Sequence, residues 1–303
     1  MIEFCGIELE HRIVNGSGTF DAIAARRAFG DALLEQFPFA AFVSKTVTLA
    51  PRQGNPAPRL WELPGGLMNS IGLPNKGLEG YLREDLPQLA ELPVPLIVNV
   101  MGSSREDVAR LVAAFAEREE VAAIELNVSC PNVKTGLVMG ADPRELAALL
   151  DHVRPHAEGK PLIVKLTPNC ASPADVAAAA EEHGADAVSL INTLRGMAMD
   201  PHRPGEPWLG GVTGGVSGPA VRAIALSQVR EVRARVALPI VGMGGVQSGR
   251  HAVDLRRSGA ELVAVGTESF RDPLAARRIA DEVSSPEEAF PANAARGDEV
   301  VRL

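Results

Sequence analysis

The segment at residues 162–192, LIVKLTPNCASPADVAAAAEEHGADAVSLIN, contains the pattern that decides the fold. It begins with a β-branched strand, continues as an alanine-rich helix and ends in a second apolar strand. Ser172 and Pro173 mark the helix start, because serine caps the first turn and proline suits the first helical position. Gly184 marks the helix end. A strand–helix–strand unit of this kind predicts two parallel strands.

The same alternation extends outward in both directions along the 303 residues. The predicted strands are 12–15, 42–45, 96–100, 122–127, 162–166, 187–192, 239–242 and 262–266. Helical patterns lie at 105–119, 143–156, 173–183, 219–235 and 249–258. Strands and helices alternating in this number predict an α/β fold, a (β/α)₈ TIM barrel, with a doubly wound sheet as the alternative from pattern alone.

Two segments between predicted strands are longer than a helix needs and are rich in glycine and proline. They span residues 51–75 and 194–219. We interpret them as elaborated loops at the C-terminal face of the barrel and not as a second domain. The whole chain, 1–303, is therefore expected to form a single domain, with a loose polar tail from about residue 284.

Composition limits the function. The net charge of −8 argues against nucleic-acid binding, which needs clustered basic residues. No apolar run approaches the roughly 18 residues of a membrane span, and no signal-peptide pattern is present, so we expect a cytoplasmic protein. The cysteines at 5, 130 and 170 are too few for an iron–sulfur cluster, which usually needs four thiolates. His152 and His156 lack a third ligand, so no metal site is predicted.

Polar residues follow the predicted strands at the points where they end. These strand ends read Asn15-Gly-Ser-Gly18, Ser44-Lys-Thr46, Asn99, Asn127-Val-Ser-Cys130, Lys165, Asn192-Thr193, Gly242-Met-Gly-Gly245 and Gly266-Thr267. One asparagine at a strand end would be an ordinary turn residue. A polar group at every strand end instead predicts an active site, because the carboxyl ends of barrel strands converge on one face.

The glycine clusters after the last two predicted strands indicate an anion site. Gly244-Gly245 and Gly266-Thr267 would offer backbone N–H groups to a phosphate at close range. The loops after strands seven and eight are the common phosphate site of barrels. A dinucleotide fingerprint fails on spacing, since Gln247 stands where its third glycine is needed. A phosphate-bearing cofactor or substrate in a barrel is therefore favoured.

Three side chains are candidates for chemistry. Lys45 and Lys165, at strand ends, should point into the barrel mouth, where a buried ammonium is costly unless paired with an anion. An internal ion pair is one interpretation, and a positive charge facing a reduced flavin or an anionic substrate is the other. Cys130 lies among polar residues, with glycines at 136 and 140 that would let the loop move, whereas Cys5 and Cys170 suit apolar packing.

Residues 127–136, NVSCPNVKTG, resemble the catalytic loop of class 1 dihydroorotate dehydrogenases, and class 1B most closely. Further matching motifs are GNPAPR at 54–59, MNSIGL at 68–73, INTLRGM at 191–197, TGGVSGPA at 213–220 and GMGG at 242–245. The similarity extends over about residues 3 to 275. Departures are Pro74, where glutamine is expected, the stretch LWEL at 60–63, and the tail after Ala280.

The resemblance implies one FMN on the C-terminal face of the barrel. The implied FMN contacts are Ser17, Gly18, Lys45, Thr46, Asn99, Asn127, Lys165, Ile191, Gly218, Gly244, Gly245, Gly266 and Thr267. The implied substrate contacts are Lys45, Asn69, Ser70, Ile71, Gly72, Leu73, Asn127, Asn192 and Thr193. Cys130 would take a proton from carbon 5 of dihydroorotate while a hydride leaves carbon 6, and Lys165 would stabilise charge on the reduced ring.

The resemblance also implies a partner. A class 1B catalytic subunit would form a homodimer at the core of a heterotetramer and pass electrons to NAD⁺ through an iron–sulfur flavoprotein subunit that carries FAD and a 2Fe–2S cluster. Alternatives are a class 1A-like enzyme that reduces fumarate and a related dihydropyrimidine-type flavin domain. Outside flavoenzymes, a phosphate-binding aldolase or isomerase with Lys165 as Schiff base, or a non-catalytic barrel, stays open.

Overall fold

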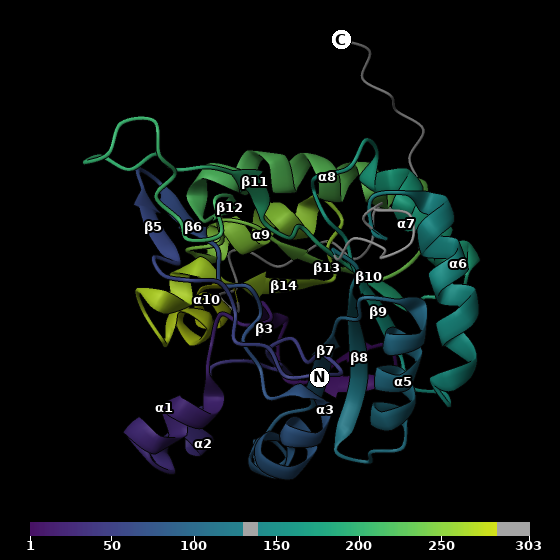
Figure 1. The fold of residues 1–303 in the computed structure, drawn as a ribbon. Helices are drawn as coiled ribbons and strands as arrows, with labels where there is room; N and C mark the ends of the chain where they lie inside the picture. Colours follow the sequence, from purple (N-terminus) through teal and green to yellow (C-terminus); the bar gives the residue numbers. More distant parts are fainter. Residues whose placement is uncertain (130–138, 284–303) are drawn as a thin grey trace.

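The computed structural model describes residues 1–129 and 139–283. Its centre is an eight-stranded sheet in the order β3-β14-β13-β10-β9-β8-β7-β4 (Figure 1). Every hydrogen-bonded pair in this sheet is parallel. The strands are β3 (Ile13–Asn15), β4 (Phe42–Val43), β7 (Leu96–Val100), β8 (Val121–Asn127), β9 (Leu162–Lys165), β10 (Ala187–Leu190), β13 (Ile240–Met243) and β14 (Leu262–Val265). The prediction of a (β/α)₈ barrel is confirmed.

A side chain closes the sheet between its first and last strands. The backbone N–H of Ala40 donates to the Ile13 carbonyl at 2.9 Å. Beyond that bond, the Asn15 amide replaces the ladder: its Nδ2 donates to the Val43 carbonyl at 2.8 Å, and the Val43 N–H donates to its Oδ1 at 2.7 Å. Asn15 is fully buried, so this pairing satisfies backbone groups that water does not reach.

Helices cover the outside of the barrel, as the alternating pattern predicts. They are α5 (Arg105–Ala116), α6 (Pro143–Val153), α7 (Pro173–Glu182), α8 (Arg222–Arg235), α9 (Gly249–Arg257) and α10 (Ala275–Val283), with short 3₁₀ turns at Arg154–His156, Pro219–Val221 and Thr267–Phe270. The predicted cap at Ser172 is confirmed, because its hydroxyl accepts from Asp175 N. Asp142 caps α6 in the same way, with its carboxylate accepting from Arg144 N. The segment predicted as a helix at 219–235 begins with a 3₁₀ turn, and its α-helix starts at Arg222.

The two glycine- and proline-rich segments meet above the barrel as a four-stranded antiparallel sheet. Its order is β11-β12-β6-β5, seen in the upper left of Figure 1. The strands are β5 (Leu60–Leu63), β6 (Gly66–Asn69), β11 (Leu194–Gly196) and β12 (Gly214–Ser217). The expected loops therefore contain strands, because pairing such as Met68 with Val216 joins segments far apart in the sequence. Trp61 and Trp208 pack there with ring centroids 5.1 Å apart.

The opposite end of the barrel is closed by an antiparallel hairpin, β1 (Ile2–Phe4) with β2 (Ile7–Leu9). Phe4, Ile7 and Leu9 are buried and pack with the small apolar side chains inside the barrel. The remaining helices, α1 (Ala22–Phe29), α2 (Ala32–Glu35), α3 (Gly77–Gly80) and α4 (Leu86–Leu89), with a π-helical turn at Tyr81–Asp85, lie between β3 and β7 in the sequence. Within the described residues, no helix is long and apolar enough to cross a membrane.

Candidate active site

A cavity of about 560 Å³ lies at the carboxyl ends of the barrel strands, beneath the antiparallel sheet. The strand ends converge there because parallel barrel strands all end on one face. Most of the residues predicted from the sequence line it. They are Ser17, Gly18, Lys45, Thr46, Asn69, Ile71, Leu73, Asn127, Lys165, Ile191, Asn192, Thr193, Gly218, Gly244, Gly245, Gly266 and Thr267. The structure thus brings together both predicted sets, and their roles as ligand contacts stay a prediction.

Three predicted contacts lie off the cavity wall. Asn99 is fully buried, and its Nδ2 donates to the Glu125 carboxylate while its Oδ1 has no partner within the described residues. The Ser70 hydroxyl donates to the Thr213 carbonyl at 2.8 Å and so holds the antiparallel sheet. At Gly72, with φ of +74°, a Cβ atom would lie 2.5 Å from the Asn55 backbone nitrogen. Asn99 and Ser70 are thus held by other protein groups, and the absence of a side chain at Gly72 lets the chain pass close to Asn55.

Cys130, predicted as the base, lies outside the described residues. Its described neighbour Ser129 contacts the cavity wall, since Asn192 Nδ2 donates to the Ser129 hydroxyl at 3.1 Å. On the far side of the segment, Gly140 N donates to the Val128 carbonyl at 2.7 Å. Val128 and Gly140, which lie on either side of this segment in the sequence, are therefore hydrogen-bonded to each other. Ser129, next to Val128, contacts Asn192, which lines the cavity.

The two predicted lysines line the same cavity in different surroundings. Lys165 is only 6% exposed, whereas Lys45 is exposed, so the expected burial holds for Lys165 alone. The register of β8 on β9 sets Asn127 directly beside Lys165. The buried carboxylate of Glu125 is held instead by Asn99 and by the Ser189 hydroxyl, at 2.6 Å from the latter. In the described part of the chain Lys165 forms no ion pair, which disfavours the internal-pair interpretation there.

The glycine turns of the cavity leave no room for side chains. A Cβ on Gly245 would lie 2.9 Å from the Gly218 carbonyl oxygen, and one on Gly244 would lie 2.6 Å from the Ala225 Cβ. Both residues also have a positive φ, +70° at Gly245 and +140° at Gly244, where residues with side chains are strained. Both glycines line the cavity without a side chain, so a ligand can approach their backbone closely, which fits a phosphate-bearing ligand.

Several lining residues were not predicted. They are Gly16, Thr19, Leu60, Leu67, Val216, Ser217, Pro219, Val221, Met243, Val246, Gln247, Glu268 and Phe270. Apolar residues from β5, β6 and β12 reach the cavity only because the distant loops pair above it. For Gln247 and Glu268 the available signal was their position, immediately after the glycine clusters.

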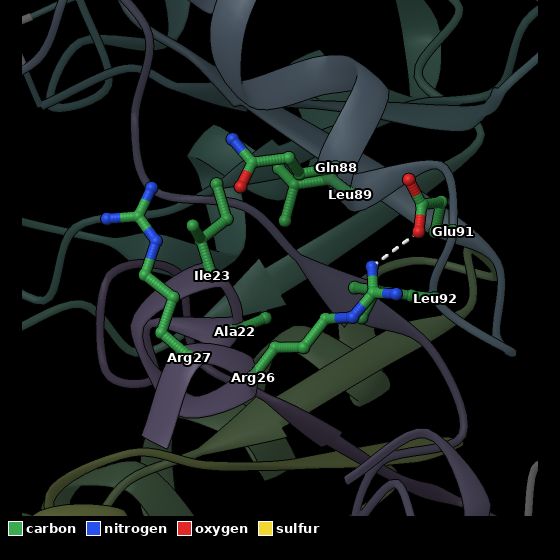
Figure 2. A pocket seen from close by; sticks show the side chains of 8 residues that line it. All are labelled: Ala22, Ile23, Arg26, Arg27, Gln88, Leu89, Glu91 and Leu92. Carbon is green, nitrogen blue, oxygen red and sulfur yellow. Dashed lines mark hydrogen bonds and ion pairs between the residues drawn. The ribbon is translucent and has the colours of Figure 1, made fainter. Parts of the chain in front are cut away.

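A second crevice of about 350 Å³ lies between α1 and α4, and none of the predicted residues lines it. Figure 2 shows Arg26 reaching across it to Glu91, with an N–O distance of 2.5 Å. Apolar side chains of Ala22, Leu89 and Leu92 form its floor. The crevice is thus a gap between α1 and the end of α4, and the Arg26–Glu91 ion pair spans it. No cluster of metal-binding side chains occurs among residues 1–129 and 139–283.

A (β/α)₈ barrel whose mouth is lined by glycine turns, a buried lysine and several amide side chains is typical of barrel enzymes. The chain belongs to the dihydroorotate dehydrogenase family, whose model matches residues 1–286. Members of this family are flavin-dependent oxidoreductases, and the predicted family and enzyme class are confirmed.

Curated relatives cover nearly the whole chain. The chain is 43% identical over 283 residues to a protein of Geobacter sp. (strain M21), and these residues make up 93% of this chain and 91% of the relative. It is 44% identical over 280 residues to one from Pelobacter propionicus, covering 92% and 90%. A relative from Maridesulfovibrio salexigens is 41% identical over 283 residues, covering 93% and 91%. Each is named "Dihydroorotate dehydrogenase B (NAD(+)), catalytic subunit".

Proposed function

We propose that this chain is the FMN-containing catalytic subunit of a dihydroorotate dehydrogenase, which oxidises dihydroorotate to orotate in pyrimidine biosynthesis. The observation that carries the proposal is the cavity itself. It combines a buried ammonium without a counter-charge in the described residues, amide side chains from three strands or loops, and glycine turns that line the cavity without side chains. The family match supports the same reaction.

The substrate side of the cavity is rich in amides. Asn127 and Asn192 lie at barrel strand ends, and Asn69 ends strand β6 of the antiparallel sheet. Asn69 Nδ2 donates to the Gly215 carbonyl at 3.3 Å, and its Oδ1 has no partner within the described residues. Amides both donate and accept, as a pyrimidine ring with its own amides and a carboxylate requires. Lys45, exposed to the cavity, supplies a cation for that carboxylate.

The phosphate-bearing side fits FMN. The turns at Gly218, Gly244, Gly245 and Gly266 would hold its phosphate, and Thr46, Asn127 and Lys165 would hold its ring. When bound, FMN supplies the hydride acceptor. Lys165 would then face negative charge that develops only during reduction, so its buried ammonium would lower the barrier without strengthening ground-state binding.

Cys130 is proposed as the base that removes the proton from carbon 5. The contact of Ser129 with Asn192 supports a role at this site for the residue that follows in the sequence. The proton transfer should take place in a site from which bulk water is excluded. Leu67 and Val216, on the antiparallel sheet above the mouth, supply apolar cover for it.

Electrons are proposed to leave through a second subunit to NAD⁺. The relatives are named as catalytic subunits of NAD⁺-dependent enzymes, which supports a partner for this chain. That partner would be an iron–sulfur flavoprotein with FAD and a 2Fe–2S cluster, on a homodimer core, in the cytoplasm. With three cysteines, this chain lacks the four thiolates that such a cluster usually needs.

The proposal is tested by flavin analysis and activity assays on the purified chain. We expect about one FMN per chain, anaerobic bleaching of its absorbance by dihydroorotate, and turnover with an artificial dye but with neither NAD⁺ nor fumarate. Release of FAD, or no flavin after reconstitution, would overturn the cofactor. Efficient fumarate reduction would indicate a class 1A-like enzyme, and efficient NAD⁺ reduction by the lone chain would overturn the partner.

A further inference from the structure

The turn at residues 244–247, after β13, is fixed from behind by two residues that do not line the cavity. Arg222 is the first residue of α8, and His251 lies in the first turn of α9. Arg222 Nη1 donates to the Gly245 carbonyl at 3.3 Å and lies 2.8 Å from His251 Nδ1 and 2.6 Å from Nε2. One guanidinium nitrogen thus joins the glycine turn to the imidazole ring.

His251 holds the other end of the same turn. The backbone N–H of Gln247 donates to His251 Nδ1 at 3.3 Å. Nδ1 must therefore carry a lone pair, which assigns the proton of the neutral ring to Nε2. A protonated ring has two donors and no acceptor, and it would also repel the adjacent guanidinium of Arg222. The contacts of Gln247 and Arg222 with Nδ1 therefore form only with the neutral ring, whereas Nε2 carries the proton and accepts no bond from Arg222.

Gln247 connects this arrangement to the second glycine turn. Its Nε2 donates to the Glu268 carboxylate at 3.0 Å, and Glu268 follows Gly266-Thr267. Its carbonyl accepts from Arg278 Nη1 at 3.1 Å. Because Gln247 is hydrogen-bonded at its N–H, its carbonyl and its side chain, a shift of His251 would be transmitted to both glycine turns that line the cavity.

We propose that Arg222 and His251 form a clamp, which positions the turn at 244–247 for the flavin phosphate and releases it when His251 is protonated. This inference rests on the proposed binding of FMN. The clamp residues are positioning residues: they act on the phosphate through Gly245 and Gln247 and touch neither cofactor nor substrate. Acid should therefore weaken FMN binding by more than ionisation of the phosphate alone accounts for.

The charged groups around His251 come from three helices. Arg222 faces it from α8, Arg250 and Asp254 lie on its own helix α9, and Glu282 faces it from α10. Burial, followed by the Arg222 charge, lowers the pKa of His251 below its ordinary value of 6.5. His251 is accordingly neutral at pH 7 and above, so the clamp is closed there and opens as the pH falls below 6.5.

The experiment compares FMN with riboflavin, which lacks the phosphate. Dissociation constants are measured by flavin fluorescence on the flavin-free full-length chain at pH 8. We expect Arg222→Ala to weaken FMN about threefold to tenfold, as for the loss of one hydrogen bond, and to leave riboflavin unchanged. Arg230→Ala, an exposed position on the same helix, is the matched control and should change neither. Equal losses for both flavins would overturn the clamp.

The acid arm uses His251→Gln, which keeps an acceptor but cannot be protonated. The phosphate's own ionisation near pH 6 affects every variant alike and cancels in the ratio of wild-type to variant dissociation constants. We expect this ratio to rise between pH 7.5 and 5.5, and a constant ratio would overturn the pH dependence. If Arg222→Ala has a much lower melting temperature than the wild type, its dissociation constants are set aside. The pH dependence of the ratio for His251→Gln then decides whether the clamp exists. Failure of the wild-type chain to bind FMN would overturn the cofactor and the clamp together, whereas normal binding with unaffected variants overturns the clamp alone.

Discussion

The two ends of the barrel are built from the same strands but have opposite character. At the amino end, Phe4 and Leu9 of the hairpin, which forms the plug of the barrel, pack against the apolar side chains inside the barrel. At the carboxyl end the strands open into a cavity whose lining combines amide and lysine side chains and glycine turns with apolar residues. Strand β8 shows the transition within one strand, because its alternate residues read Ala123, Glu125 and Asn127 from plug to mouth.

The amino end of the barrel therefore contributes mainly to stability, and the carboxyl end contains the residues proposed for catalysis. Burial at the plug gives favourable transfer free energy and has no functional constraint. At the mouth, Lys165 is buried without a counter-charge in the described residues, an arrangement that costs stability in the absence of an anionic ligand. Changes at the two ends should therefore affect different measurements, and the following variants test that separation in order of expected effect.

The largest effect is expected at the mouth, for Cys130→Ala. Removal of a positioned base should slow flavin reduction by dihydroorotate by about 10²–10⁴-fold while FMN stays bound. Stopped-flow absorbance measures the rate. Cys170→Ala is the control, because the Cys170 thiol is half-buried and donates to the Thr167 carbonyl. Near-normal reduction by Cys130→Ala would show that the base lies elsewhere.

At the plug, Phe4→Ala should lower the free energy of unfolding by about 3–5 kcal/mol, the usual cost of truncating a fully buried phenylalanine. The rate of flavin reduction by the folded fraction should not change. Phe29, 60% exposed on α1, is the matched control, and Phe29→Ala should alter stability by less than about 0.5 kcal/mol. A slower reduction rate in Phe4→Ala would contradict the separation of the two ends.

Lys165, the last residue of strand β9, and Lys160, which precedes the strand, provide a further test of the comparison. Lys165→Met should slow flavin reduction by about 10²–10³-fold without lowering the melting temperature of the flavin-free chain, since a buried charge is removed. Lys160, before the strand, donates to the Val121 carbonyl at 2.6 Å. Lys160→Met should instead cost about 0.5–1.5 kcal/mol of stability and leave the rate unchanged. Loss of folding in Lys165→Met would assign that lysine a structural role.

The smallest effect concerns the thiol at the plug. Burial, followed by the Asp186 charge, raises the pKa of Cys5 to about 12. At pH 8 only about one Cys5 in ten thousand is then a thiolate, so iodoacetamide should leave Cys5 unmodified while Cys130 reacts. Labelling of Cys5 should increase only as the pH rises toward 12. Peptide mass spectrometry after timed alkylation measures both sites, and rapid labelling of Cys5 at pH 8 would contradict a closed plug.

By itself the sequence determined the barrel and most of its mouth. Strand and helix periods, proline and serine caps at Pro173 and Ser172, and polar residues at each strand end are local signals, and local signals can be read along the chain. The glycine turns at 244–245 were predicted for the same reason, since only glycine combines positive φ with close approach of the backbone.

The strands that cover the cavity and the contacts behind it depend on packing between distant segments. Strands β5, β6, β11 and β12 are only three or four residues long, and they form because segments about 150 residues apart pair with each other. The closure of the barrel by Asn15 and the network from Arg222 through His251 to Gln247 likewise depend on side chains from separate elements. Such contacts leave no periodic signal, because their geometry is set by packing between elements and not by neighbours along the chain.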